Sequence, residues 1–71
     1  MQEKRIADIT YPIRLGQFLK LINLVQDGFE AKILIQSGKI KVNGHIERQR
    51  GKQLQKNDNV QLEDGSIYSL K

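Results

Sequence analysis

The sequence predicts an α+β fold in which two helices pack on a small, mainly antiparallel sheet. The apolar residues of the first half recur with the period of an amphipathic helix, and after Gly38 the period changes to the alternation of strands. Asn-Gly and Asp-Gly pairs separate the later apolar runs, as turns do. The chain has 71 residues without an internal repeat or a linker-like stretch, so we expect a single domain over residues 1–71 with a small core.

Two helices are expected before Gly38. The first spans residues 15–25, and its apolar stripe consists of Leu15, Phe18, Leu19, Leu21, Ile22 and Val25. Asp27 can cap the second helix, with Glu30 three residues later in a capping-box arrangement. Gly38 can adopt the left-handed conformation that follows a helix, so this helix should end near Ser37. Its expected buried residues are Ala31, Leu34 and Ile35.

A half-buried strand should follow, because Ile40 and Val42 alternate with polar residues. Asn43-Gly44 is the preferred pair for a type I′ turn, so we expect a tight hairpin in which Ile46 resumes the apolar pattern. The other expected strands are a short edge strand over residues 4–9, one that carries Val60 and Leu62, and a final one over residues 67–70.

The basic residues are concentrated in about one third of the chain. The net charge is +4, yet the segment from Lys32 to Lys56 has seven basic residues and one acidic residue, which gives +6 and leaves −2 for the rest. Several of these cations lie in a polar loop expected at residues 48–53, before Leu54 returns to the core. A local positive field attracts phosphate and releases counterions, so we expect a nucleic-acid partner.

The composition argues against several other functions. The chain has no Cys, and His45 is its single histidine, so we expect no disulfide, no metal site and no cofactor. No Ser-His-acid set or Gly-rich phosphate loop is identifiable, so an enzyme is not expected. Without a signal peptide or a long apolar run, we expect a soluble, cytoplasmic monomer with no membrane partner.

Several short motifs are more specific than the periodicity. They are Arg14-Leu15 with Phe18-Leu19, Glu30-Ala31-Lys32, the run Gly38-Lys39-Ile40-Lys41-Val42-Asn43-Gly44, and Asn57-Asp58 ahead of Val60. Over residues 13–62 this pattern resembles the RNA-binding domain named after ribosomal small-subunit protein four, also called the alpha-L motif. In its length the chain is similar to the small stand-alone bacterial members of that family.

The resemblance implies that the second helix, the next strand and the neighbouring loop form one surface for structured RNA, either ribosomal or transfer RNA, without catalysis. It also implies ribosomes or ribosomal particles as partners. The residues expected in this surface are Arg14, Lys32, Lys39, Lys41, Asn43, Arg48, Arg50 and Lys52. The chain departs from the family pattern at Gly16, in place of an aspartate, and at Asp27-Gly28, in place of Ser-Arg. Either binding is weaker, or Arg48, Arg50 and Lys52 take over the contact that the arginine would make.

Some of these residues also have a purely structural interpretation. Lys39 and Lys41 share the outward face of one strand, where lysines also protect a sheet edge from association. Asn43 is expected to act mainly in the turn, and Arg14 could equally hold a carboxylate near the first helix. The aromatic residues that could stack on bases are Tyr11, Phe18, Phe29 and Tyr68, of which Phe18 is assigned to the core.

Two other binding functions remain as alternatives. The basic face could bind an acidic protein partner, and the chain would then be a small protein-interaction adaptor. Double-stranded DNA fits less well, because Asp27 and Glu30 would repel phosphate if the second helix entered a major groove. A rigid basic surface would read the shape of RNA more than its sequence.

Overall fold

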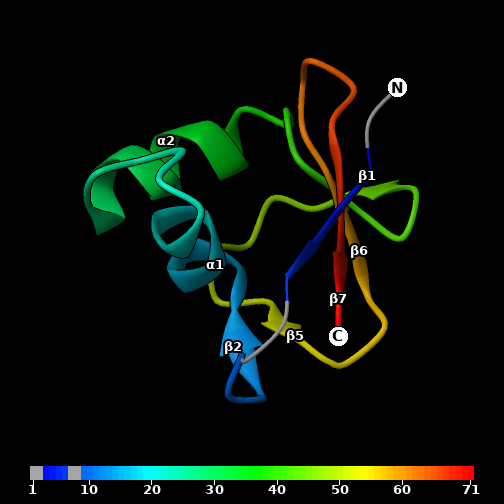
Figure 1. Ribbon diagram of the computed structural model, residues 1–71. Helices are drawn as coiled ribbons and strands as arrows, with labels where there is room; N and C mark the ends of the chain where they lie inside the picture. Colours follow the sequence, from blue (N-terminus) through cyan, green and yellow to red (C-terminus); the bar gives the residue numbers. More distant parts are fainter. Residues whose placement is uncertain (1–2, 7–8) are drawn as a thin grey trace.

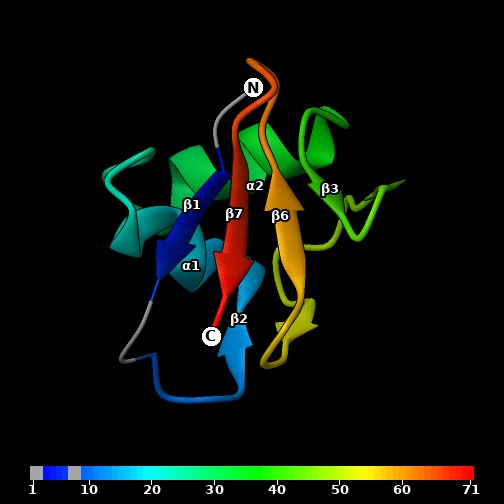
Figure 2. The ribbon, with the colours of Figure 1, turned by 45° about the vertical axis from the view of Figure 1, so that its right-hand side comes forward.

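Two short helices cover one face of a five-stranded sheet, as Figures 1 and 2 show from two directions. The computed structural model describes residues 3–6 and 9–71, with side chains from residue 9 onward. The elements in chain order are β1 (Glu3–Ile6), β2 (Ile13–Arg14), α1 (Leu15–Leu21), α2 (Gly28–Gln36), β3 (Lys41–Val42), β4 (His45–Ile46), β5 (Gln53–Leu54), β6 (Asn59–Gln61) and β7 (Ile67–Leu70). The predicted α+β class is confirmed.

The large sheet has the strand order β1-β7-β6-β3-β4. Among the described strands of this sheet, only β1 and β7 pair in parallel, so the prediction of a mainly antiparallel sheet is correct. A second, two-stranded sheet pairs β2 with β5 and was not predicted from the sequence. Its strands have two residues each, which is too short for the alternation of apolar and polar residues to be recognised.

The first helix is shorter than predicted, because it ends at Leu21 and not at residue 25. Asn23 adopts a left-handed conformation with a φ angle of 62°. Its amide donates to the carbonyl oxygen of Lys20 at 3.0 Å, and the Leu24 amide donates to that of Leu19 at 3.0 Å. This is a Schellman motif with asparagine in the position usually held by glycine. Asn23 was therefore the residue in the sequence that could have indicated the early end of this helix.

The second helix begins and ends as predicted. The Glu30 amide donates to the Asp27 carboxylate at 2.9 Å, and the Glu30 carboxylate accepts from the Gln26 amide at 2.9 Å. Gly38 follows the C-cap Ser37 with a φ angle of 81°, which an L side chain rarely adopts. Both capping signals were local, so the sequence predicted them well.

The predicted hairpin forms between β3 and β4, with φ angles of 53° at Asn43 and 86° at Gly44. The last strand also has its predicted bounds. The expected edge strand over residues 4–9 is observed as β1, which lies at the sheet edge and ends at Ile6. Ile9 is outside the strand, and the part of that prediction at residues 7 and 8 falls outside the described residues.

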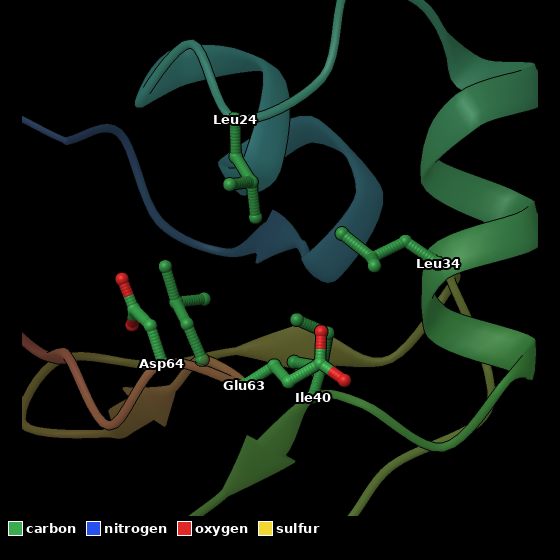
Figure 3. A pocket seen from close by; sticks show the side chains of 6 residues that line it. Leu24, Leu34, Ile40, Glu63 and Asp64 are labelled. Atoms are coloured by element: carbon green, nitrogen blue, oxygen red, sulfur yellow. The ribbon is translucent and has the colours of Figure 1, made fainter.

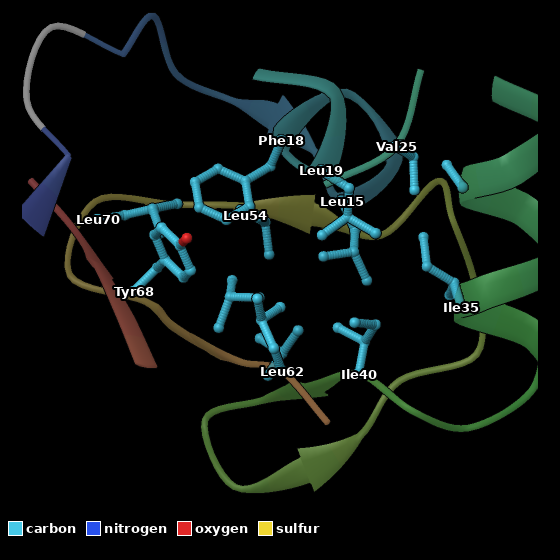
Figure 4. Close-up of a cluster of buried hydrophobic side chains, with 13 residues drawn as sticks. Leu15, Phe18, Leu19, Val25, Ile35, Ile40, Leu54, Leu62, Tyr68 and Leu70 are labelled. Carbon is cyan, nitrogen blue, oxygen red and sulfur yellow. The ribbon is translucent and has the colours of Figure 1, made fainter. Parts of the chain in front are cut away.

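The core lies between the helices and the sheet, as Figure 4 shows. Its buried apolar residues are Leu15, Phe18, Leu19, Val25, Ala31, Ile35, Ile40, Val42, Leu54, Val60, Leu62, Tyr68 and Leu70. Leu21, predicted in the buried stripe, is instead exposed, because six residues after Leu15 it points about 120° away from that residue around α1. Leu34 is only partly buried. Ile46 is exposed on β4. Within the described residues, no helix has the length and apolar character needed to cross a membrane.

Candidate nucleic-acid interface

The loop of residues 48–52 crosses the start of α1. The first amides of a helix lack helical acceptors, and here Leu15 and Gly16 find them in the loop. Their amides donate to the carbonyl oxygens of Lys52 and Arg50 at 2.8 and 2.9 Å. The loop backbone is thus attached to the helix, while the side chains of Arg48, Arg50 and Lys52 are exposed. A loop held in this way can present cations in a fixed arrangement.

Arg50 lies against both glycines at which the sequence departs from the pattern it resembles. Its Nη1 atom donates a long hydrogen bond of 3.4 Å to the carbonyl oxygen of Gly28. A Cβ atom at Gly28 would lie 3.7 Å from Nη1, and one at Gly16 would lie 3.6 Å from the Arg50 Cβ atom. A longer side chain at either position would therefore meet the arginine. The guanidinium stands beside position 28, where the family pattern has its own arginine.

Arg48 lies at the opposite end of α2, over Gly38. A Cβ atom at Gly38 would come within 2.8 Å of Arg48 Nη2, so the glycine leaves space for the guanidinium in addition to closing the helix. The carbonyl end of a helix carries a partial negative charge, which favours a cation there. The second helix therefore has one loop arginine near each end.

Lys32 lies between these two arginines along the length of α2. It follows Gly28 by four residues, so the two positions share a helix face, and its side chain is exposed. Arg50, Lys32 and Arg48 thus follow one another along a helix of nine residues, or about 14 Å. We call these three residues the α2 cation row. It joins residues that are up to 18 positions apart in the chain.

Lys39 and Lys41 border a shallow hollow on the outward side of β3, together with Gln61 and Glu63. The Nζ atom of Lys39 is 3.6 Å from Oε2 of Glu63, so the carboxylate neutralises part of its field. Both side chains of this pair are largely exposed, and such pairs contribute little to stability. Lys41 therefore offers more free positive charge to an anion than Lys39 does.

The exposed side chain of Asn43 is held by two hydrogen bonds within the protein. Its Nδ2 atom donates to Asp58 Oδ1 at 3.1 Å, and its Oδ1 atom accepts from the Asn59 amide at 2.9 Å. These bonds attach the β3–β4 turn to the beginning of β6. They give Asn43 a structural role beyond turn geometry, and an RNA contact by this residue stays a prediction.

We expect Asn43→Ala to lower the free energy of unfolding by about 1–2 kcal/mol, because alanine loses both hydrogen bonds and is strained at positive φ. Urea unfolding followed by circular dichroism would measure this change. Asn43→Gly avoids the strain but does not restore the two hydrogen bonds, so it should be more stable than Asn43→Ala and less stable than wild type. Equal stability of wild type and Asn43→Ala would show that the hydrogen bonds of Asn43 to Asp58 and Asn59 do not stabilise the fold.

Arg14 is exposed at the end of β2 and pairs in register with Gln53, the residue after Lys52. Its amide donates to Gln17 Oε1 at 3.1 Å. Within residues 9–71, no carboxylate forms an ion pair with its guanidinium, so the interpretation of Arg14 as a carboxylate partner finds no support there. The pairing of β2 with β5 therefore places Arg14 next to the loop of residues 48–52.

The four aromatic residues differ strongly in exposure. Phe18 and Tyr68 are buried with their rings edge to face, 5.8 Å apart at the centroids, so they cannot stack on bases. Tyr11 is half-buried, and its hydroxyl donates to the Lys71 carbonyl oxygen at 2.7 Å. Desolvation and, less strongly, the Asp58 carboxylate raise the pKa of Tyr11 above its usual value of 10.0. Phe29 is 69% exposed and is the one ring of the four that is freely accessible.

A separate hollow lies between α2, the segment after α1 and the β6–β7 turn, and Figure 3 shows its lining. Leu24, Leu34 and Ile40 make it apolar, and Glu63 and Asp64 add negative charge at its edge. Carboxylates repel phosphate, so this hollow is unsuited to a nucleic-acid backbone. It borders the side of α2 opposite Lys32, since residues two apart in a helix point about 200° apart.

Sequence reasoning missed the place that Arg50 occupies. The sequence left two outcomes open at Gly28, weaker binding or replacement of the missing arginine by Arg48, Arg50 and Lys52, and the structure puts the Arg50 guanidinium beside that glycine. The available signal was the occurrence of glycine in the first turn of each helix, at Gly16 and Gly28, where glycine is a poor helix former. Glycines in such places indicate the close approach of another segment.

A fixed α+β scaffold with cations along a helix is typical of a small nucleic-acid-binding domain. A family model described as "S4 domain" matches residues 6–69, which extends the resemblance noted over residues 13–62 in both directions. The chain therefore belongs to the S4 domain family, the RNA-binding family whose motifs it carries. It is also 39% identical over 61 residues to a protein of Bacillus subtilis (strain 168) named "Probable ribosome maturation protein RlbA", with 86% of each chain covered.

Proposed function

We propose that this protein binds folded ribosomal RNA through the α2 cation row, with Lys41 and Lys52 beside it. The observation that carries the proposal is the row itself, in which one loop arginine lies near each end of α2 and an exposed lysine lies between them along the helix. Arginine forks match phosphate oxygens, and lysine adds a mobile charge. The surface would thus contact the RNA backbone at several points and recognise its shape.

Ribosomal RNA is favoured over transfer RNA by the Bacillus subtilis relative, which is named for ribosome maturation. We infer that this chain also takes part in ribosome maturation, by binding ribosomal particles. In this proposal it binds without catalysing a reaction, works as a monomer and resides in the cytoplasm. Arg14, Lys39 and Asn43 belong to the edge of the surface. Because Lys39 and Asn43 already make contacts within the protein, both should contribute less to RNA binding.

Fluorescence anisotropy with a labelled ribosomal RNA hairpin tests this function. Neutralising about five phosphates should make affinity fall roughly 100-fold or more between about 50 and 200 mM salt. A transfer RNA and a DNA duplex with the sequence of the hairpin stem serve as comparisons, and both should bind more weakly. Absence of binding to any RNA at low salt would contradict the proposal.

Sedimentation of a cell lysate tests the link to ribosomes. The protein should move with ribosomal particles at low salt and leave them at high salt. Nuclease treatment should release it as well, because the contact is to RNA. Retention on a protein partner after complete RNA digestion would instead support the adaptor function, in which the basic face binds an acidic protein.

A further inference from the structure

Phe29 is the most exposed large apolar side chain in residues 9–71, at 69%. It is the second residue of α2 and takes no part in the core. Single exposed apolar residues are common, so exposure alone assigns no function. The surroundings of this ring are what distinguish it.

Two members of the α2 cation row flank Phe29. Arg50 reaches the carbonyl oxygen of Gly28, the residue immediately before the ring, and Lys32 follows Phe29 by three residues on the same side of the helix. Ile33, one turn later, is 55% exposed and extends the apolar surface. An exposed ring therefore lies within one turn of two cations at the start of α2.

The nearby carboxylates limit what can bind there. Asp27 accepts from the Glu30 amide, and Glu30 accepts from the Gln26 amide, so both face the helix backbone as caps. They weaken the positive field around the ring itself, so a phosphate placed directly over Phe29 would be disfavoured. A ring that stacks on a neutral base avoids this repulsion, while Arg50 and Lys32 remain able to hold the adjoining phosphates.

We propose that Phe29 stacks on an unpaired base next to an RNA helix, with Arg50 and Lys32 on its flanking phosphates. Every base has an aromatic face, so such a contact selects an exposed nucleotide and not a particular sequence. The proposal rests on the RNA-binding function given above and makes it more specific. The preferred ligand is a folded RNA that has an unpaired nucleotide beside its duplex, such as a bulge.

Two RNA hairpins with the same stem test the stacking, one fully paired and one with a single-nucleotide bulge. Wild-type protein should bind the bulged RNA about 5- to 100-fold more tightly, the range expected for one stacked base. Phe29→Leu keeps an apolar side chain but loses the ring, so it should lose this preference. Phe29→Tyr should keep it. Ile33→Ala is the matched control, an exposed apolar residue on the same helix, and should also keep it.

A fluorescence measurement reports the stacking directly, because the chain contains no Trp. F29W should be quenched by the bulged RNA and much less by the paired one, whereas I33W should respond equally little to both. Equal binding of the two RNAs by wild type, or a preference that survives Phe29→Leu, would overturn the proposal. Equal losses with Phe29→Leu and Ile33→Ala would show that the preference depends on apolar surface in general and not on the ring, and would also overturn the proposal. Failure to bind either RNA would refute the RNA-binding function itself.

Discussion

Phe18→Ala is expected to lower the free energy of unfolding by about 3–5 kcal/mol, the usual cost of removing a buried aromatic ring. Phe18 is fully buried between the helices and the sheet, and its ring meets Tyr68 edge to face with an interplanar angle of 82°. A domain of 71 residues buries a small core, so this loss is a large share of its stability. Urea unfolding at equilibrium, followed by circular dichroism, would measure it.

Leu21→Ala provides the matched control, because Leu21 is in the same helix but 53% exposed. It should cost less than about 0.5 kcal/mol, as surface substitutions do. If both substitutions destabilise the protein equally, the side chain of Leu21 must be buried like that of Phe18. That outcome would contradict the exposed position of Leu21 on α1.

Removing both loop arginines should have the largest effect on binding. We expect Arg48→Ala combined with Arg50→Ala to weaken affinity for a ribosomal RNA hairpin by about 30-fold at low salt, or about 2 kcal/mol. The salt dependence should also become shallower by roughly 1.5 in the slope of log affinity against log salt, because two phosphate contacts are lost. Anisotropy titrations at several salt concentrations give both quantities.

The combination of Lys20→Ala with Lys71→Ala removes the same charge from exposed residues outside the α2 cation row. It should reduce affinity less than threefold and leave the salt slope nearly unchanged. Circular dichroism would verify that both double variants stay folded. Equal effects of the two pairs would mean that net charge, and not the arrangement of Arg48 and Arg50, determines binding.

The features that the sequence predicted well depend on neighbouring residues. The type I′ turn needs positive φ at Asn43 and Gly44, and the second helix needs Asp27 before it and Gly38 after it. Each of these requirements acts within a few positions of the chain. Local propensity therefore predicted both the elements and most of their boundaries.

The features that it missed depend on contacts between distant segments or on rarer signals. The β2–β5 sheet forms only because the chain returns to Ile13 some forty residues later, at Leu54. Arg50 contacts Gly28, which is 22 positions away in the sequence, and the periodicity of apolar residues does not predict such a contact. The early end of α1 had a local cause, but asparagine is a less frequent left-handed cap than glycine, so the apolar stripe was extended too far.

Amide chemical shifts of the isotope-labelled protein, titrated with a folded ribosomal RNA hairpin, would test the central claim most directly. The claim is that RNA contacts the side of α2 that carries the cation row. The largest changes should occur at Gly28, Lys32 and Arg50, with smaller ones at Lys41. Changes concentrated instead around the acidic hollow of Leu24 and Glu63, with Arg50 and Lys32 unaffected, would contradict the account.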